Sequence, residues 1–141
     1  MLTIKEFKGK VISGVLSYYA NELADEGGER STAAGIKDAV DFFAGSSLYQ
    51  VAMELVELSK MLAKTLTLTN KQKLENMNAL NFLRVRITTL SYMFELMKIA
   101  HGYDTDHPEI ARWYAKILGT DTIEVSAKLD EELPDASQFY T

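Results

Sequence analysis

The sequence predicts an all-α fold, a compact bundle of four main helices with one or two short C-terminal helices. Apolar residues recur at alternating steps of three and four, the spacing that places side chains on one face of a helix. Residues 65–69 alternate like a strand, but the chain offers no second strand to pair with them. At 141 residues the length suits a single domain. We therefore expect one domain over residues 1–134 and a flexible tail over 135–141.

The segment from residue 80 to residue 99 carries apolar side chains on two opposite sides of one predicted helix. One stripe contains Leu80, Leu83, Ile87, Leu90, Phe94 and Met97, and the other contains Phe82, Val85, Tyr92, Leu96 and Ile99, with Thr89 at its middle. A helix that is apolar all round is normally buried. We expect this helix to be clasped by neighbours on two sides and to self-associate through one of its faces.

Capping residues and glycines mark the first two helices. Thr3, followed three residues later by a glutamate, has the capping-box spacing, so a helix should begin there and end at Gly27 and the glycine after it. Ser31 or Thr32 is expected to cap a second helix that closes at Gly45. These two helices can cover one side of the helix over residues 80–99.

The third and fourth helices are expected to form an antiparallel hairpin. Ser46 or Ser47 starts the third, whose apolar stripe is Leu48, Val51, Leu55, Leu58 and Leu62. Thr69 or Asn70 caps the fourth, which extends to about His101 and is long enough to bend or break once. The short connection between compatible apolar faces favours folding back.

The C-terminal part of the chain predicts one or two shorter helices. Asp106 and Pro108 suit a cap and a first helical turn, and the helix that follows carries Trp113. A last helix over residues 121–133 has a thin apolar stripe and ends before Pro134.

Composition and charge exclude several classes of function. The chain has no cysteine, which removes disulfides and thiolate chemistry and is typical of a reducing compartment, so we expect a cytoplasmic protein. No apolar run approaches the roughly 20 residues that cross a bilayer, and we expect no membrane partner. Residues 1–101 hold 12 Lys and Arg against 11 Asp and Glu, whereas residues 102–141 hold 3 against 9. This balance disfavours direct binding to nucleic acid.

One cluster contains ligand types that a metal ion could use, namely His101, Asp104, Asp106, His107 and Glu109. These residues span a predicted helix end and a loop, and capping explains two of them. No catalytic constellation appears, and we expect no metal or cofactor. A metal-dependent hydrolase using His101, Asp104 and His107 is kept as an alternative function.

Two arginines, Arg84 and Arg86, lie on the flanks of the helix that we expect to be buried. One interpretation is that they reach water or pair with a carboxylate such as Glu54 or Glu57. The other places them at an interface with a partner, where arginine is enriched.

The sequence therefore predicts a non-enzymatic protein–protein interaction module, such as an adaptor, an assembly protein or an inhibitor. The reason is the excess of apolar helical faces. The interaction candidates are Arg84, Arg86, Phe82, Val85, Trp113, Phe139 and Tyr140. The partner's identity is open, and a homo-oligomer is one possibility. A further alternative is that the acidic segment over residues 104–135 acts as a decoy that blocks a nucleic-acid-binding protein.

Overall fold

The computed structural model describes residues 4–20, 23 and 30–100, and this part of the chain contains helices and no strand. The predicted all-α class is confirmed. Within the same residues, no helix combines the length and the apolar character that crossing a membrane requires. The expected C-terminal helices and the tail over residues 135–141 lie outside the described residues.

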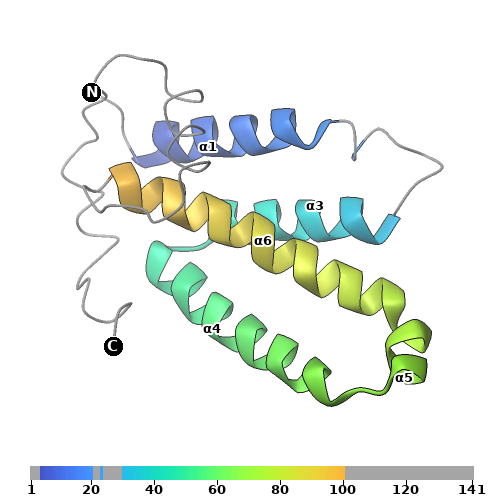
Figure 1. Ribbon diagram of the computed structural model, residues 1–141. Helices are drawn as coiled ribbons and strands as arrows, with labels where there is room; N and C mark the ends of the chain where they lie inside the picture. The colour runs from blue at the N-terminus through green and yellow to red at the C-terminus, as the bar shows by residue number, and fades with distance from the viewer. Residues whose placement is uncertain (1–3, 21–22, 24–29, 101–141) are drawn as a thin grey trace.

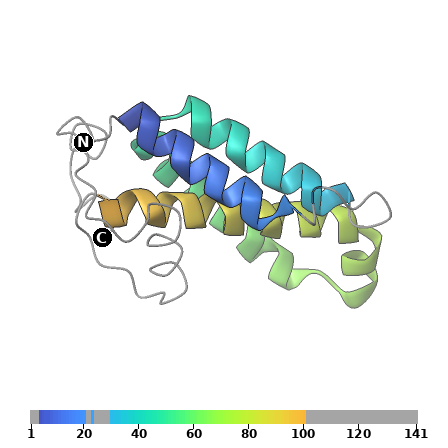
Figure 2. The same ribbon diagram turned by 90° about the horizontal axis from the view of Figure 1, so that it is seen from above.

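Three of the four main helices pack around the fourth, which is the last described helix of the chain. The elements are α1 (Ile4–Tyr18), α3 (Arg30–Gly45), α4 (Leu48–Lys64), the 3₁₀ turn η1 (Thr65–Thr67), α5 (Asn70–Glu75) and α6 (Met77–Ala100). Helix α6 crosses the middle of the molecule and contacts α1, α3 and α4 (Figure 1). Seen from above, α1 and α3 run alongside each other (Figure 2). Helices α4 and α6 run in opposite directions, so the predicted antiparallel hairpin is present.

Two of the predicted N-terminal caps, Ser47 and Thr69, form capping boxes. The Ser47 hydroxyl accepts a hydrogen bond from the Gln50 amide at 3.2 Å, and the Gln50 side-chain oxygen accepts one from the Ser47 amide at 2.8 Å. Thr69 and Gln72 repeat the pattern at 3.2 and 2.9 Å. Each box satisfies backbone amides that a helix start leaves unpaired, which fixes where α4 and α5 begin.

The predicted cap of the second helix is wrong, because the helix begins two to three residues earlier than a cap at Ser31 or Thr32 would allow. Helix α3 begins at Arg30, so Ser31 and Thr32 lie inside it. Their hydroxyls accept hydrogen bonds from the side-chain amide of Asn81 on α6, at 2.8 and 2.9 Å. The two residues therefore join α3 to α6 rather than capping α3.

The expected bend in the fourth helix is a complete break at Asn76. This residue has φ −111°, and its side-chain amide donates to the Gln72 carbonyl at 2.8 Å. Helix α6 starts afresh at Met77, and the Leu80 amide donates to the Asn76 carbonyl at 2.9 Å. The Gln72 carbonyl therefore accepts hydrogen bonds from both the backbone amide, at 3.0 Å, and the side-chain amide of Asn76.

The core surrounds the C-terminal half of α6, whereas the two apolar stripes predicted burial along the whole of residues 80–99. Buried residues of α6 are Leu90, Met93, Phe94, Leu96 and Met97, and they cluster with Phe7, Val11 and Val15 of α1, Ile36, Ala39, Val40 and Phe43 of α3, and Leu48, Val51, Ala52 and Leu58 of α4. Thr89 is also fully buried. In the N-terminal half of α6, Phe82 and Val85 are only half-buried. The helix is therefore sandwiched along one half and more open along the other.

Candidate interaction surface

Arg86 connects the helices on either side of α6. Its Nε lies 2.5 Å from a carboxylate oxygen of Asp38 on α3, and its Nη1 donates to Glu54 on α4 at 3.1 Å. The Arg86 side chain is 17% exposed, and the guanidinium carbon lies 5.6 Å from the centre of the Phe42 ring. The pairing with Glu54 is one of the two interpretations that the sequence offered. Arg86 thus holds three helices together by its charge.

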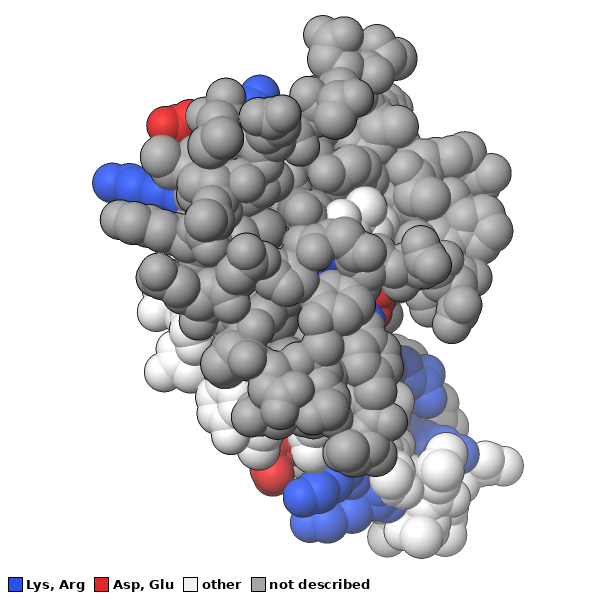
Figure 3. All heavy atoms as spheres, turned by 90° about the vertical axis from the view of Figure 1, so that its left-hand side faces the viewer, with Lys and Arg blue, Asp and Glu red and all other residues white. Residues whose placement is uncertain are grey.

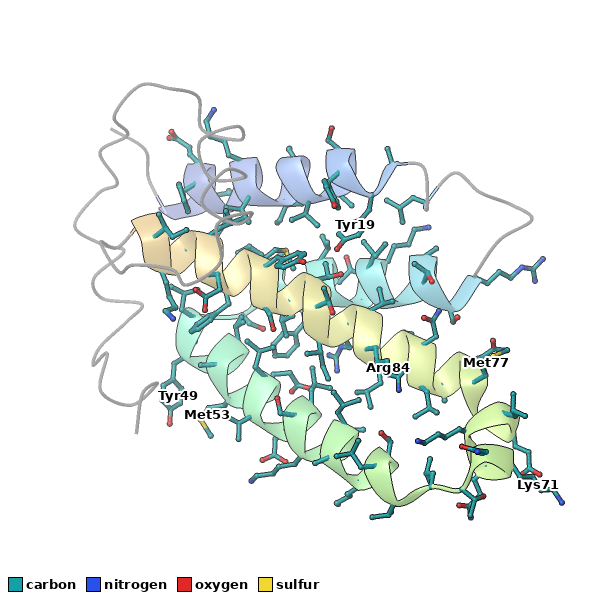
Figure 4. All side chains as sticks on the ribbon, viewed as in Figure 1. Tyr19, Tyr49, Met53, Lys71, Met77 and Arg84 are labelled. Carbon is teal, nitrogen blue, oxygen red and sulfur yellow. The ribbon has the colours of Figure 1, made fainter. Side chains whose placement is uncertain are left out.

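The other candidates on α6 differ from Arg86 in their surroundings. Arg84 is exposed (Figure 4). Val85 contacts α3, because a Cβ atom added to Gly35 would lie 3.1 Å from its Cγ1. Phe82 is half-buried, and its carbonyl oxygen would lie 3.0 Å from the same added Cβ atom. Val85 and Phe82 therefore take part in the contact between α3 and α6 within the chain.

Several predicted residues lie outside the described part of the chain. These are Trp113, Phe139 and Tyr140 among the interaction candidates, and His101, Asp104 and His107 of the alternative metal site. The acidic segment over residues 104–135 lies there as well. Within residues 4–20, 23 and 30–100, no group of three or more His, Cys, Asp or Glu side chains is placed to hold a metal ion.

Helix α4 exposes an apolar face that the other described helices do not cover. Tyr49, Met53 and Val56 are 43%, 45% and 46% exposed, and their spacing of four and three residues places them on one side of the helix. Figure 4 shows Tyr49 and Met53 pointing away from α6. We call these three residues the outer face of α4. The opposite side of the helix carries Leu48 and Leu58, which are buried in the core.

A second exposed apolar group lies where the hairpin turns, in residues 60–77, which we call the hairpin end. Exposed there are Met61 (52%), Leu66 (77%), Leu74 (72%) and Met77 (61%). The same residues include Lys60, Lys64, Lys71 and Lys73, with Glu75 as their one acidic residue. Figure 3 shows Lys and Arg side chains beside uncharged ones at the lower edge of the molecule, where Figure 1 places the end of α4 and α5. The hairpin end is therefore both apolar and basic.

The sequence contained a signal for the outer face of α4 that the prediction did not use. Tyr49, Met53 and Val56 form a second stripe beside the buried stripe of the same helix, as the two stripes of α6 do. A helix with apolar side chains on two sides is expected to have a packing neighbour on each of them. Helices α1, α3 and α4 of this chain are the neighbours of α6, whereas the second side of α4 is exposed among the described residues.

No protein-family model, no curated protein and no solved structure matches the chain. Its function is therefore inferred from its own residues.

Proposed function

We propose that the protein is a non-enzymatic interaction module that binds another protein through the outer face of α4 and the hairpin end. One observation carries this proposal. Of the eight large apolar side chains exposed among the described residues, seven lie between Tyr49 and Met77. Isolated exposed apolar residues are normal on a protein surface, but a concentration in one stretch of chain is typical of a contact site.

The opposite side of α4 supports the proposal because it makes the surface rigid. Leu48, Val51 and Leu58 are at most 2% exposed and anchor the helix to α6. The Glu54 carboxylate adds the contact with Arg86. A partner that docks on the outer face therefore meets a helix already ordered, so little conformational entropy is lost on binding.

The apolar side chains of this surface can contribute a substantial part of a binding free energy. Covering one large apolar side chain contributes roughly 1.5–3 kcal/mol, and a change of about 1.4 kcal/mol alters an equilibrium constant tenfold. Two or three such side chains therefore offset a large part of the cost of association. Self-association through a face of α6 stays a prediction, and a second copy is one candidate partner.

Site-specific crosslinking tests the proposal. A photoreactive residue is placed at Met53 or at Leu74 of the full chain in its host cells, and the same residue at the exposed Lys37 on α3 serves as the control. We expect one protein, identified by mass spectrometry, to be joined through Met53 and Leu74 and not through Lys37. Equal labelling at all three positions would contradict the proposal.

A pair of variants measures the contribution of the outer face once the partner is identified. Met53→Gln combined with Val56→Gln removes two apolar side chains from α4, and Ser59→Gln changes another exposed position of the same helix. We expect the first variant to bind the partner at least tenfold more weakly and the second to bind normally. Equal affinity of both variants would show that the partner binds elsewhere.

A further inference from the structure

The chemistry of the hairpin end specifies what can cover it. Leu66 and Leu74 are the two most exposed large apolar side chains of the described residues, and four lysines lie within residues 60–77 against one glutamate. A suitable occupant must present apolar side chains together with carboxylates. Lys60 already pairs with Glu57 at 3.3 Å, which leaves Lys64, Lys71 and Lys73 as the lysines that an acidic occupant would meet. An occupant with positive charge would be repelled by them.

One segment of this chain has that composition. Residues 121–135 contain six Asp and Glu against one Lys. The apolar residues between these charges are Ile123, Val125, Leu129 and Leu133. The segment therefore offers apolar side chains to the apolar residues of the hairpin end and carboxylates to its lysines.

We propose that residues 121–135 bind the hairpin end of the same chain and cover it until a partner displaces them. This inference rests on the proposed function, because it concerns the regulation of the same surface. The partner and the segment would compete for the same leucines and lysines. Binding of the partner would then depend on how readily the acidic segment leaves.

The length of the chain permits this contact. Helix α6 carries the chain about 36 Å away from the hairpin end, at 1.5 Å per residue over its 24 residues. The 20 residues from 101 to 120 can span up to about 65 Å when extended. A segment tethered in this way has an effective concentration in the millimolar range, so its own chain is favoured over a second copy in dilute solution.

Paramagnetic relaxation in the full chain tests the proposal directly. The chain contains no cysteine, so Ala127→Cys provides one attachment site for a nitroxide label within the acidic segment. We expect the label to broaden the amide signals of Leu66 and Leu74 and to leave those of Lys5 to Lys10 sharp. In about 1 M salt, where the Debye length is ~3 Å, the broadening should be lost.

A charge-reversal pair provides the matched control. Lys71→Glu with Lys73→Glu should abolish the broadening at Leu66 and Leu74, whereas Lys5→Glu with Lys10→Glu changes the net charge equally on α1 and should leave it intact. Figure 4 shows Lys71 at the outer end of the hairpin, where its replacement does not disturb the core. Broadening that survives the first pair of substitutions would overturn the proposal.

Other occupants of the hairpin end give different results. Broadening in a mixture of isotope-labelled chain and separately spin-labelled chain would assign the contact to a second copy and overturn the proposal. Binding of the full chain to phosphatidylserine vesicles, with no broadening at the hairpin end, would assign the surface to a membrane and overturn the proposal too.

The experiments also separate this inference from the proposed function. If the broadening at Leu66 and Leu74 is absent but a partner is still crosslinked through Met53, this inference is wrong and the proposed function is retained. Broadening without any crosslinked partner supports this inference and counts against the proposed function.

Discussion

Gly35 of α3 lies directly against the backbone of Phe82 on α6. A Cβ atom added to Gly35 would be 3.0 Å from the Phe82 carbonyl oxygen and 3.1 Å from Cγ1 of Val85. Contacts this short are rare for a real Cβ atom. The oxygen belongs to the main chain of a helix, so it cannot rotate away as a side chain could. The close approach of α3 and α6 therefore depends on the absence of a side chain at residue 35.

Gly35→Ala is expected to destabilise the protein by up to about 2 kcal/mol. Alanine is favoured over glycine within a helix by about 1 kcal/mol, but an extra carbon in a packed contact costs typically 1–3 kcal/mol. The steric cost should exceed the gain because α3 and α6 must separate along their whole contact. The free energy of unfolding, measured in urea, checks the expectation.

Gly9→Ala is the matched control on α1. A Cβ atom at Gly9 meets nothing within 4 Å, so only the helix preference remains. We expect this substitution to stabilise the protein by up to about 1 kcal/mol. Stabilisation of the same size by Gly35→Ala would show that α3 and α6 are less closely packed than described.

Thr89→Val is expected to increase stability by about 1 kcal/mol. The Thr89 side chain is fully buried, and its hydroxyl has no hydrogen-bond partner among the described residues. A buried hydroxyl without a partner retains the cost of leaving water, and valine has the same shape without that group. Thr88→Val, at the exposed neighbouring position, should change stability by less than about 0.5 kcal/mol. A lower melting temperature for Thr89→Val would indicate that the hydroxyl is hydrogen-bonded in solution.

Arg86→Met is expected to destabilise the protein by roughly 1–3 kcal/mol. The substitution leaves Asp38 and Glu54 without their cation, and Glu54 is 29% exposed. The loss should be smaller than for a fully buried ion pair, since water reaches both carboxylates. The same change at the exposed Arg84 should alter the free energy of unfolding by less than about 0.5 kcal/mol. Equal effects at the two arginines would mean that the ion pairs of Arg86 contribute nothing to stability.

Local signals in the sequence predicted most of the fold. The caps at Ser47 and Thr69 depend on residues three positions apart, and the sandwiching of α6 depends on the spacing of its own apolar residues. Each can therefore be recognised within one segment of chain. The break in the fourth helix was expected, but its position at Asn76 was not, because it depends on one side-chain amide reaching a carbonyl.

Contacts between distant segments could not be derived in the same way. The sequence offered Glu54 as a partner for Arg86 but did not identify Asp38, and it gave no sign that Gly35 faces Phe82. These contacts depend on how α3 is rotated against α6, which no periodicity within one helix determines. For the same reason, the second apolar stripe of α4 does not reveal whether this chain or another molecule covers it.

The two sides of α4 should respond differently to the same substitution. Leu58→Gln places an amide in the core, where the leucine is 2% exposed, and should destabilise the protein by about 2–5 kcal/mol. Val56→Gln lies on the outer face, at 46% exposure, and should change the free energy of unfolding by less than about 0.5 kcal/mol. Urea titrations of both variants measure this difference. If Val56→Gln were as damaging as Leu58→Gln, the outer face would be packed within the folded protein, which would contradict its assignment as an exposed docking surface.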